Sequence, residues 1–190
     1  MAVGKTTAVQ YLQAHAPYVH LSYEDNSYVA AEIKSRGLDK NVYTDYLEIQ
    51  RLWLRKEVVR WEKARAYPCT VMDFGAEEIE FYTLHYPRPI GQVWEVERAL
   101  HSELEAVRRC MPDRILFLDA PEEVLRQRKG QDKTRSRNFF EHYLTHFLPL
   151  KKAWFLQKEN VDILDVSGLS SGEVGRQVKA WVDLQMLRGG

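Results

Sequence analysis

Apolar residues along this chain gather in short continuous runs that alternate with longer stretches of helical spacing. The clearest run covers residues 114–118, and the longest helical stretch covers residues 44–65, where apolar side chains recur every three or four positions. Strands are predicted at residues 18–23, 69–74, 114–118 and 161–166. Helices are predicted at residues 6–15, 28–36, 44–65, 92–109, 121–129, 138–158 and 171–187. The proline-containing stretch 81–89 is predicted to be a loop.

The predicted strands are unbroken apolar runs, in which apolar and polar residues do not alternate. This pattern is typical of a parallel sheet covered by helices on both faces. We therefore predict an α/β fold with three layers, and a single domain over residues 1–190.

Charge and composition argue against several classes of protein. The chain has 27 Lys and Arg against 27 Asp and Glu, so no overall positive field favours nucleic acid or an anionic membrane. Its two cysteines exclude a disulfide-stapled domain and a four-cysteine zinc site. No apolar run is long enough for a transmembrane helix, and the first residues do not resemble a signal peptide. We expect a cytoplasmic protein with no membrane partner; a homodimer stays open.

A phosphate-binding motif stands where the first helix is predicted to begin. Gly4, Lys5, Thr6 and Thr7 match the end of the pattern G-x-x-x-x-G-K-[ST]. In that pattern glycine lets the backbone N–H groups curl around phosphates, and the helix N-terminus adds a positive dipole. Lys5 would reach the β- and γ-phosphates of ATP, and the hydroxyl of Thr6 would bind Mg²⁺. An ordinary N-terminal arm with a stray lysine is the alternative.

The motif is incomplete at its front. Its first glycine would fall at position −1, and the strand that normally leads into the loop is missing. We expect the natural protein to begin upstream of Met1, with an apolar strand and the rest of the loop.

Carboxylates follow two of the predicted strands. Glu24 and Asp25 come after the first strand, and Asp73 ends the second. Ligands of open α/β sheets bind beyond the carboxyl ends of the strands. One of Glu24 and Asp25 is the candidate general base, and Asp73 is a candidate Mg²⁺ ligand. A solvated acidic turn is the alternative for the first pair.

A basic segment follows the helix at residues 121–129. Six cations fall within twelve positions, namely Arg126, Arg128, Lys129, Lys133, Arg135 and Arg137. Such a cluster repels itself unless an anion arrives, and arginine suits phosphate oxygens. We predict that Arg128, Arg135 and Arg137 close over the phosphates from a lid at about residues 129–137. A basic surface for solubility or for RNA is the alternative.

Taken together, these features resemble the P-loop kinases of the nucleoside and nucleotide kinase group, such as deoxynucleoside and thymidylate kinases. The resemblance rests on Gly4-Lys5-Thr6, the carboxylates after the strands, and the run from Arg114 to Arg128. It implies the three-layer P-loop NTPase fold with an arginine-bearing lid, and we expect the first strand of that fold to be missing from residues 1–190. The chain departs from deoxynucleoside kinases at Asp73-Phe74-Gly75, which lacks their arginine after the acidic residue.

The expected function is transfer of the γ-phosphate of ATP, with Mg²⁺, to a small acceptor. A nucleoside or nucleotide is the first choice, and a sugar or antibiotic hydroxyl stays open. A P-loop nucleotide hydrolase and a non-catalytic nucleotide-binding protein are the alternatives.

Overall fold

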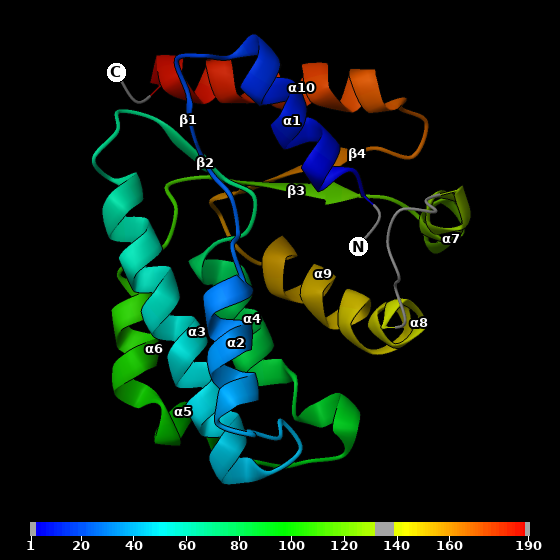
Figure 1. Ribbon diagram of the computed structural model, residues 1–190. Helices are drawn as coiled ribbons and strands as arrows, with labels where there is room; N and C mark the ends of the chain where they lie inside the picture. Colours follow the sequence, from blue (N-terminus) through cyan, green and yellow to red (C-terminus); the bar gives the residue numbers. More distant parts are fainter. Residues whose placement is uncertain (1–2, 132–138, 189–190) are drawn as a thin grey trace. The chain divides into compact units, whose positions relative to one another are not determined.

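The computed structural model describes residues 3–131 and 139–188, and its chain divides into two compact units (Figure 1). The first unit comprises residues 1–21 and 113–190, and the second comprises residues 22–112. Each unit is described by itself. The prediction of a single domain stays a prediction.

A parallel pair of strands forms the centre of the first unit. Strand β3 (Ile115–Asp119) pairs with β4 (Val161–Asp165), with Ile115 opposite Val161 and Asp119 opposite Asp165. Figure 1 shows helices α1 (Lys5–His15) and α10 (Ser171–Arg188) on one side of these strands and α9 (Leu148–Leu156) on the other. The rings of Phe117 and Phe155 join β3 to α9, with their centroids 5.3 Å apart.

Helices α1 and α10 approach each other very closely at Gly175. A Cβ atom added there would lie 2.4 Å from Cγ of Tyr11 and 2.6 Å from its Cβ. Real Cβ atoms do not come this close to other carbon atoms, so any side chain at position 175 would overlap with Tyr11. Gly175 therefore sets the spacing of the two helices. The apolar faces that meet around this contact are formed by Ala8, Val9, Leu12, Val174, Val178 and Val182.

The described part of the connection from β3 to β4 is mainly helical. It comprises α7 (Glu122–Gln131), α8 (Phe140–His142), the π-helical segment η2 (Tyr143–Phe147) and α9. Within the predicted helix at 138–158, the residues from Phe140 to Leu156 are helical. Its π-helical segment ends just before Pro149, whose ring has no N–H and clashes with the preceding turn of an α-helix.

Helices dominate the second unit. Its helices are α2 (Ser27–Ser35), α3 (Tyr43–Ala64), α4 (Ala76–His85), the 3₁₀ turn η1 (Arg88–Ile90), α5 (Val96–Ala99) and α6 (His101–Arg108). Helices α3, α4 and α6 pack against one another (Figure 1). Their core is built from fully buried side chains such as Leu54, Leu100, Leu104 and Val107.

Two further strands pair near the start of the second unit. Strand β1 (His20–Ser22) crosses the boundary between the units, and it forms a two-stranded parallel sheet with β2 (Thr70–Met72). The Asp73 N–H continues the pairing by donating to the Ser22 carbonyl oxygen at 3.4 Å.

The predicted three-layer P-loop NTPase fold with one parallel sheet is wrong for the described residues. They form two separate two-stranded sheets, β1–β2 and β3–β4, among many helices. The apolar runs identify the strands, but they do not determine which strands pair. In the second unit a hydrophobic cluster forms between helices and needs no sheet to cover it.

Two local predictions are wrong in part. The expected loop at 81–89 is helical as far as His85, because Ile79 and Phe81 are buried and the prolines come after the helix end. The expected helix at 92–109 begins at Val96 and breaks at Leu100, whose φ and ψ of −115° and 24° are not helical. No described helix has the length and apolar character needed to cross a membrane.

Candidate functional site

The predicted phosphate-binding residues lie at the start of α1 in the first unit. Gly4 precedes the helix with φ 96° and ψ 12°, a left-handed conformation that favours glycine. Its carbonyl oxygen accepts the first helical bond, from the Ala8 N–H at 2.9 Å. Lys5 and Thr6 follow in the first turn with exposed side chains. N–H groups of a first helical turn point out of the helix end, where an anion is stabilised by them and by the helix dipole.

The structure brings Glu24 and Asp73 together in the second unit. The Glu24 N–H donates to Oδ1 of Asp73 at 2.8 Å, so the residues that follow β1 and β2 are joined by this bond. Glu24 is half-buried. A carboxylate in this position has a fixed backbone and is open enough for an acceptor hydroxyl to approach it, and a general base must lie within hydrogen-bond reach of that hydroxyl.

The Asp25 side chain makes its hydrogen bonds within its own turn, to Ser27. Its Oδ1 accepts hydrogen bonds from the Ser27 N–H at 2.9 Å and the Ser27 hydroxyl at 2.6 Å. These bonds lower the pKa of Asp25, whose side chain is exposed. A carboxylate stabilised in its charged form is a weaker proton acceptor, and this one holds the turn that leads into α2. Between the two predicted bases, the contacts favour Glu24.

Arg60 of α3 links the ends of β1 and β2, and it was not among the site residues predicted from the sequence. The residue is 9% exposed, and its guanidinium donates to the Ser22 carbonyl and hydroxyl oxygens and to the Phe74 carbonyl oxygen. It also donates to Oδ1 of Asp73 at 3.2 Å, the oxygen that accepts the Glu24 N–H. The planar fork of arginine suits such a set of converging acceptors.

Glu57 lies one turn before Arg60 and balances its charge. One oxygen of Glu57 accepts a bond from Arg60 at 3.3 Å, whereas Oε1 is buried with no hydrogen-bond partner. Burial raises the pKa of Glu57, and the nearby Arg60 opposes this shift. Beside them Lys56 donates to Oδ1 of Asn26 at 2.7 Å, and burial lowers the pKa of Lys56.

A signal for Glu57 and Arg60 was present in the sequence. Both charged residues lie on the buried face of α3, which also carries Leu54 and Ala64. Charged side chains are rarely buried unless they are paired. Two opposite charges three residues apart on an apolar helix face therefore indicate a buried ion pair.

The arginines predicted for the lid are only partly described. Arg128, in the last turn of α7, donates through Nη2 to the carbonyl oxygens of Val166 at 2.5 Å and Leu169 at 3.0 Å. It thereby holds the loop between β4 and α10. Arg135 and Arg137 lie outside the described residues, so their closure over phosphates stays a prediction.

A second carboxylate at a strand end was also missed. Asp119 ends β3, and its Oδ1 pairs with Nζ of Lys152 at 2.7 Å. The same oxygen accepts the Ala120 N–H at 2.9 Å. Asp119 could have been predicted from the sequence, because it directly follows the predicted strand at 114–118. Asp73 was chosen by the same reasoning, since it lies at the end of the predicted strand at 69–74.

The Mg²⁺ ligands predicted from the sequence, Thr6 and Asp73, belong to different units. Among the described residues no group of three or more His, Cys, Asp or Glu side chains could hold a metal ion. The Thr6 hydroxyl fits a Mg²⁺ ion whose other ligands are phosphate oxygens and waters. Asp73 fits less well, since the Arg60 guanidinium lies 3.2 Å from its Oδ1 and repels a cation.

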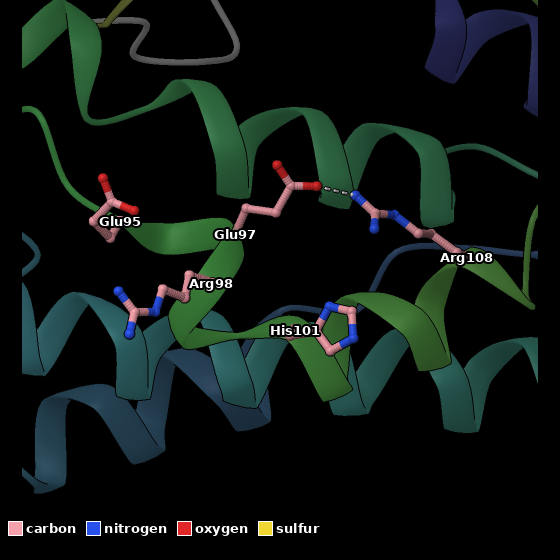
Figure 2. Close-up of a pocket in the computed structure, with 5 residues that line it drawn as sticks. All are labelled: Glu95, Glu97, Arg98, His101 and Arg108. Carbon is pink, nitrogen blue, oxygen red and sulfur yellow. Dashed lines mark hydrogen bonds and ion pairs between the residues drawn. The ribbon is translucent and has the colours of Figure 1, made fainter.

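An open hollow of about 600 Å³ lies elsewhere in the second unit, lined by Glu95, Glu97, Arg98, His101 and Arg108 (Figure 2). Arg108 bonds to Glu97 at 2.7 Å, and it also bonds to Glu80 at 2.6 Å. These carboxylates raise the pKa of Arg108 and keep it charged. The hollow contains none of the predicted site residues, and its ion pairs join α4, α5 and α6.

A comparison with protein-family models and with curated proteins finds no match for this chain. The resemblance to P-loop kinases therefore stays a prediction from the motifs.

Proposed function

We propose that this protein is an ATP-dependent phosphotransferase that acts on a hydroxyl or phosphate group of a small acceptor, with a nucleoside or nucleotide as the first choice. The observation that carries the proposal is the left-handed Gly4 directly before Lys5 and Thr6 at the start of α1. This combination of a turn glycine, a lysine and a hydroxyl at a helix N-terminus suits the β- and γ-phosphates of a nucleotide. A cytoplasmic location goes with this proposal.

In the proposed reaction Glu24 accepts the proton of the acceptor hydroxyl. The hydroxyl oxygen forms a bond to the γ-phosphorus, the bond from that phosphorus to the β–γ bridging oxygen breaks, and ADP leaves with the electron pair. Lys5 stabilises the negative charge on the phosphate oxygens. When bound, Mg²⁺ would neutralise part of the same charge, and Thr6 would be its protein ligand.

The proposal is tested with ATP labelled at the γ-phosphate, Mg²⁺ and a panel of acceptors. The panel contains nucleosides, nucleoside monophosphates, sugars and hydroxyl-bearing antibiotics, and the products are separated by chromatography. We expect a labelled acceptor with the wild type, and a rate about 10²–10⁴-fold lower with Glu24→Gln. Glu32→Gln in α2 is the matched control, because it removes a charge from another half-buried glutamate that pairs with Arg36.

Each outcome has a distinct meaning. A labelled acceptor that depends on Glu24 and not on Glu32 supports the proposal. Labelled inorganic phosphate without a labelled acceptor would identify a nucleotide hydrolase instead. Binding of ATP without any turnover would identify a non-catalytic nucleotide-binding protein, and neither binding nor turnover would refute the whole assignment.

A further inference from the structure

Arg60 is the most heavily bonded charged residue described around the predicted carboxylates. Its guanidinium reaches the backbone and side chain of Ser22, the last residue of β1, and it reaches Asp73 and the Phe74 carbonyl, which follow β2. One side chain therefore fixes the chain on both sides of the point where the two strands end. Glu57 supplies the opposite charge that a buried guanidinium requires.

A route leads from Arg60 to Glu24. Oδ1 of Asp73 accepts a bond from Arg60 at 3.2 Å and a bond from the Glu24 N–H at 2.8 Å. The position of this single oxygen depends on Arg60, and the position of the Glu24 backbone depends on this oxygen. A displacement of the Asp73 carboxylate would thus move Glu24.

We propose that Arg60 is the positioning residue for Glu24, and that it acts through the Asp73 carboxylate. This inference rests on the proposed function, in which Glu24 is the general base. It gives Asp73 a role in holding the base, in addition to the role in metal binding expected from the sequence. It also accounts for the choice of arginine at a buried position of α3.

The first test is Arg60→Lys, which keeps the positive charge. Lysine is a point charge on a flexible stem and cannot reach acceptors on both strand ends at once. Misplacement of a catalytic group by about 1 Å costs up to about 10²-fold in rate. We expect kcat to fall by about 10- to 100-fold while KM for ATP stays within about twofold.

Arg51→Lys is the matched control. Arg51 also lies on α3 and pairs with two carboxylates, Glu48 at 2.6 Å and Glu103 at 3.3 Å. Neither of these ion pairs reaches the ends of β1 or β2. We expect Arg51→Lys to leave kcat within about twofold of the wild type.

The second variant, Asp73→Ala, removes the intermediate carboxylate and leaves Arg60 paired with Glu57. If Arg60 acts through Asp73, the double variant Arg60→Lys/Asp73→Ala loses no more activity than the more damaged single variant, because both changes break one link. Effects on kcat that multiply in the double variant would overturn the route through Asp73.

Hydrogen exchange of the Glu24 amide, measured by NMR, gives a readout that does not depend on activity. We expect faster exchange at this amide in Arg60→Lys and in Asp73→Ala, and an unchanged rate in Arg51→Lys. Unchanged exchange in Arg60→Lys, or faster exchange with an unchanged kcat, would reduce Arg60 to a structural clamp and overturn the inference. If the wild type transfers no phosphate to any acceptor, the proposed function fails, and Arg60 then has no base to position. The exchange rates still decide whether Arg60 holds Glu24 in place.

Discussion

The close contact of α1 and α10 at Gly175 gives a quantitative prediction for Gly175→Ala. The added Cβ would lie 2.4, 2.6 and 2.7 Å from Cγ, Cβ and Cδ2 of Tyr11. Rotation of the tyrosine side chain does not move its own Cβ, so the helix backbones must separate. Overpacking of this kind costs about 1–3 kcal/mol, and the better helix propensity of alanine returns about 1 kcal/mol.

Gly172→Ala is the matched control in the same helix. There the added Cβ would meet only the flexible end of the Arg176 side chain, at 3.6 Å. This variant keeps the propensity gain without the clash, so it should be as stable as the wild type or up to about 1 kcal/mol more stable. The free energies of unfolding of the two variants should therefore differ by about 1–3 kcal/mol, with Gly175→Ala the less stable.

The assay is urea unfolding followed by circular dichroism, with thermal unfolding alongside. A difference of 1 kcal/mol corresponds to about 2–4 °C in Tm for a chain of this size. In a Tyr11→Ala background, which removes two of the three close atoms, the penalty of Gly175→Ala should shrink. Equal or greater stability of Gly175→Ala relative to Gly172→Ala would refute the close packing of α1 and α10.

Gly175→Ala is also expected to affect the candidate phosphate site at Gly4. Cγ1 of Val174, the neighbour of Gly175, lies 3.8 Å from the place where a Cβ on Gly4 would be. A shift of α1 away from α10 therefore alters the packing behind Gly4. We expect Gly175→Ala to bind ATP more weakly than Gly172→Ala does.

Two further predictions concern stability. Tyr46→Phe removes the hydroxyl that donates to the Thr83 carbonyl oxygen at 2.8 Å, so the free energy of unfolding should fall by about 1 kcal/mol in urea titrations; an unchanged midpoint would contradict this bond. Burial raises the pKa of the Tyr46 phenol, which keeps the hydroxyl protonated, and the loss should be the same at pH 6 and pH 9. Asp162→Asn removes a carboxylate whose pKa is lowered from 3.8 by hydrogen bonds from Arg114 and Trp181. A lowered pKa stabilises the folded state above the unfolded value of 3.8 and ceases to do so as the pH falls through the folded pKa. Because the side chain is partly exposed, the wild type should exceed the variant by no more than about 1 kcal/mol at pH 7, and thermal unfolding should show this gap closing below pH 4; a gap that grows in acid would contradict the assignment.

Individual helices and strands could be predicted from the sequence wherever a single hydrophobic pattern indicates one of them. The apolar run at 114–118 became β3 at Ile115–Asp119, and the helical spacing over 44–65 became α3 at Tyr43–Ala64. Both patterns depend on neighbours along the chain. The pairing of strands depends on contacts between distant residues, so the predicted single sheet did not follow from the same evidence.

For the candidate site too, the sequence predicts the local features and not those that depend on distant residues. The left-handed Gly4 before α1 is a local feature, and the motif at residues 4–7 indicated it. The choice between Glu24 and Asp25 depends on whether Asp73 or Ser27 is the partner, and no spacing rule distinguishes the two. The sequence indicates that Arg60 is buried and paired, but its role does not follow from the sequence, because its acceptors Ser22 and Asp73 lie at the ends of two strands, 38 and 13 residues away.

The central claim is that the nucleotide phosphates bind at Gly4, Lys5 and Thr6, and calorimetric titration with ATP and Mg²⁺ tests it most directly. The titration compares the wild type with Lys5→Ala and with Lys34→Ala, which removes an exposed lysine from α2. A hydrogen bond to a charged group contributes about 1.5–3 kcal/mol, so Kd for ATP should rise by about 10- to 100-fold in Lys5→Ala and stay unchanged in Lys34→Ala. Binding of ATP by Lys5→Ala as tight as that of the wild type would contradict the account.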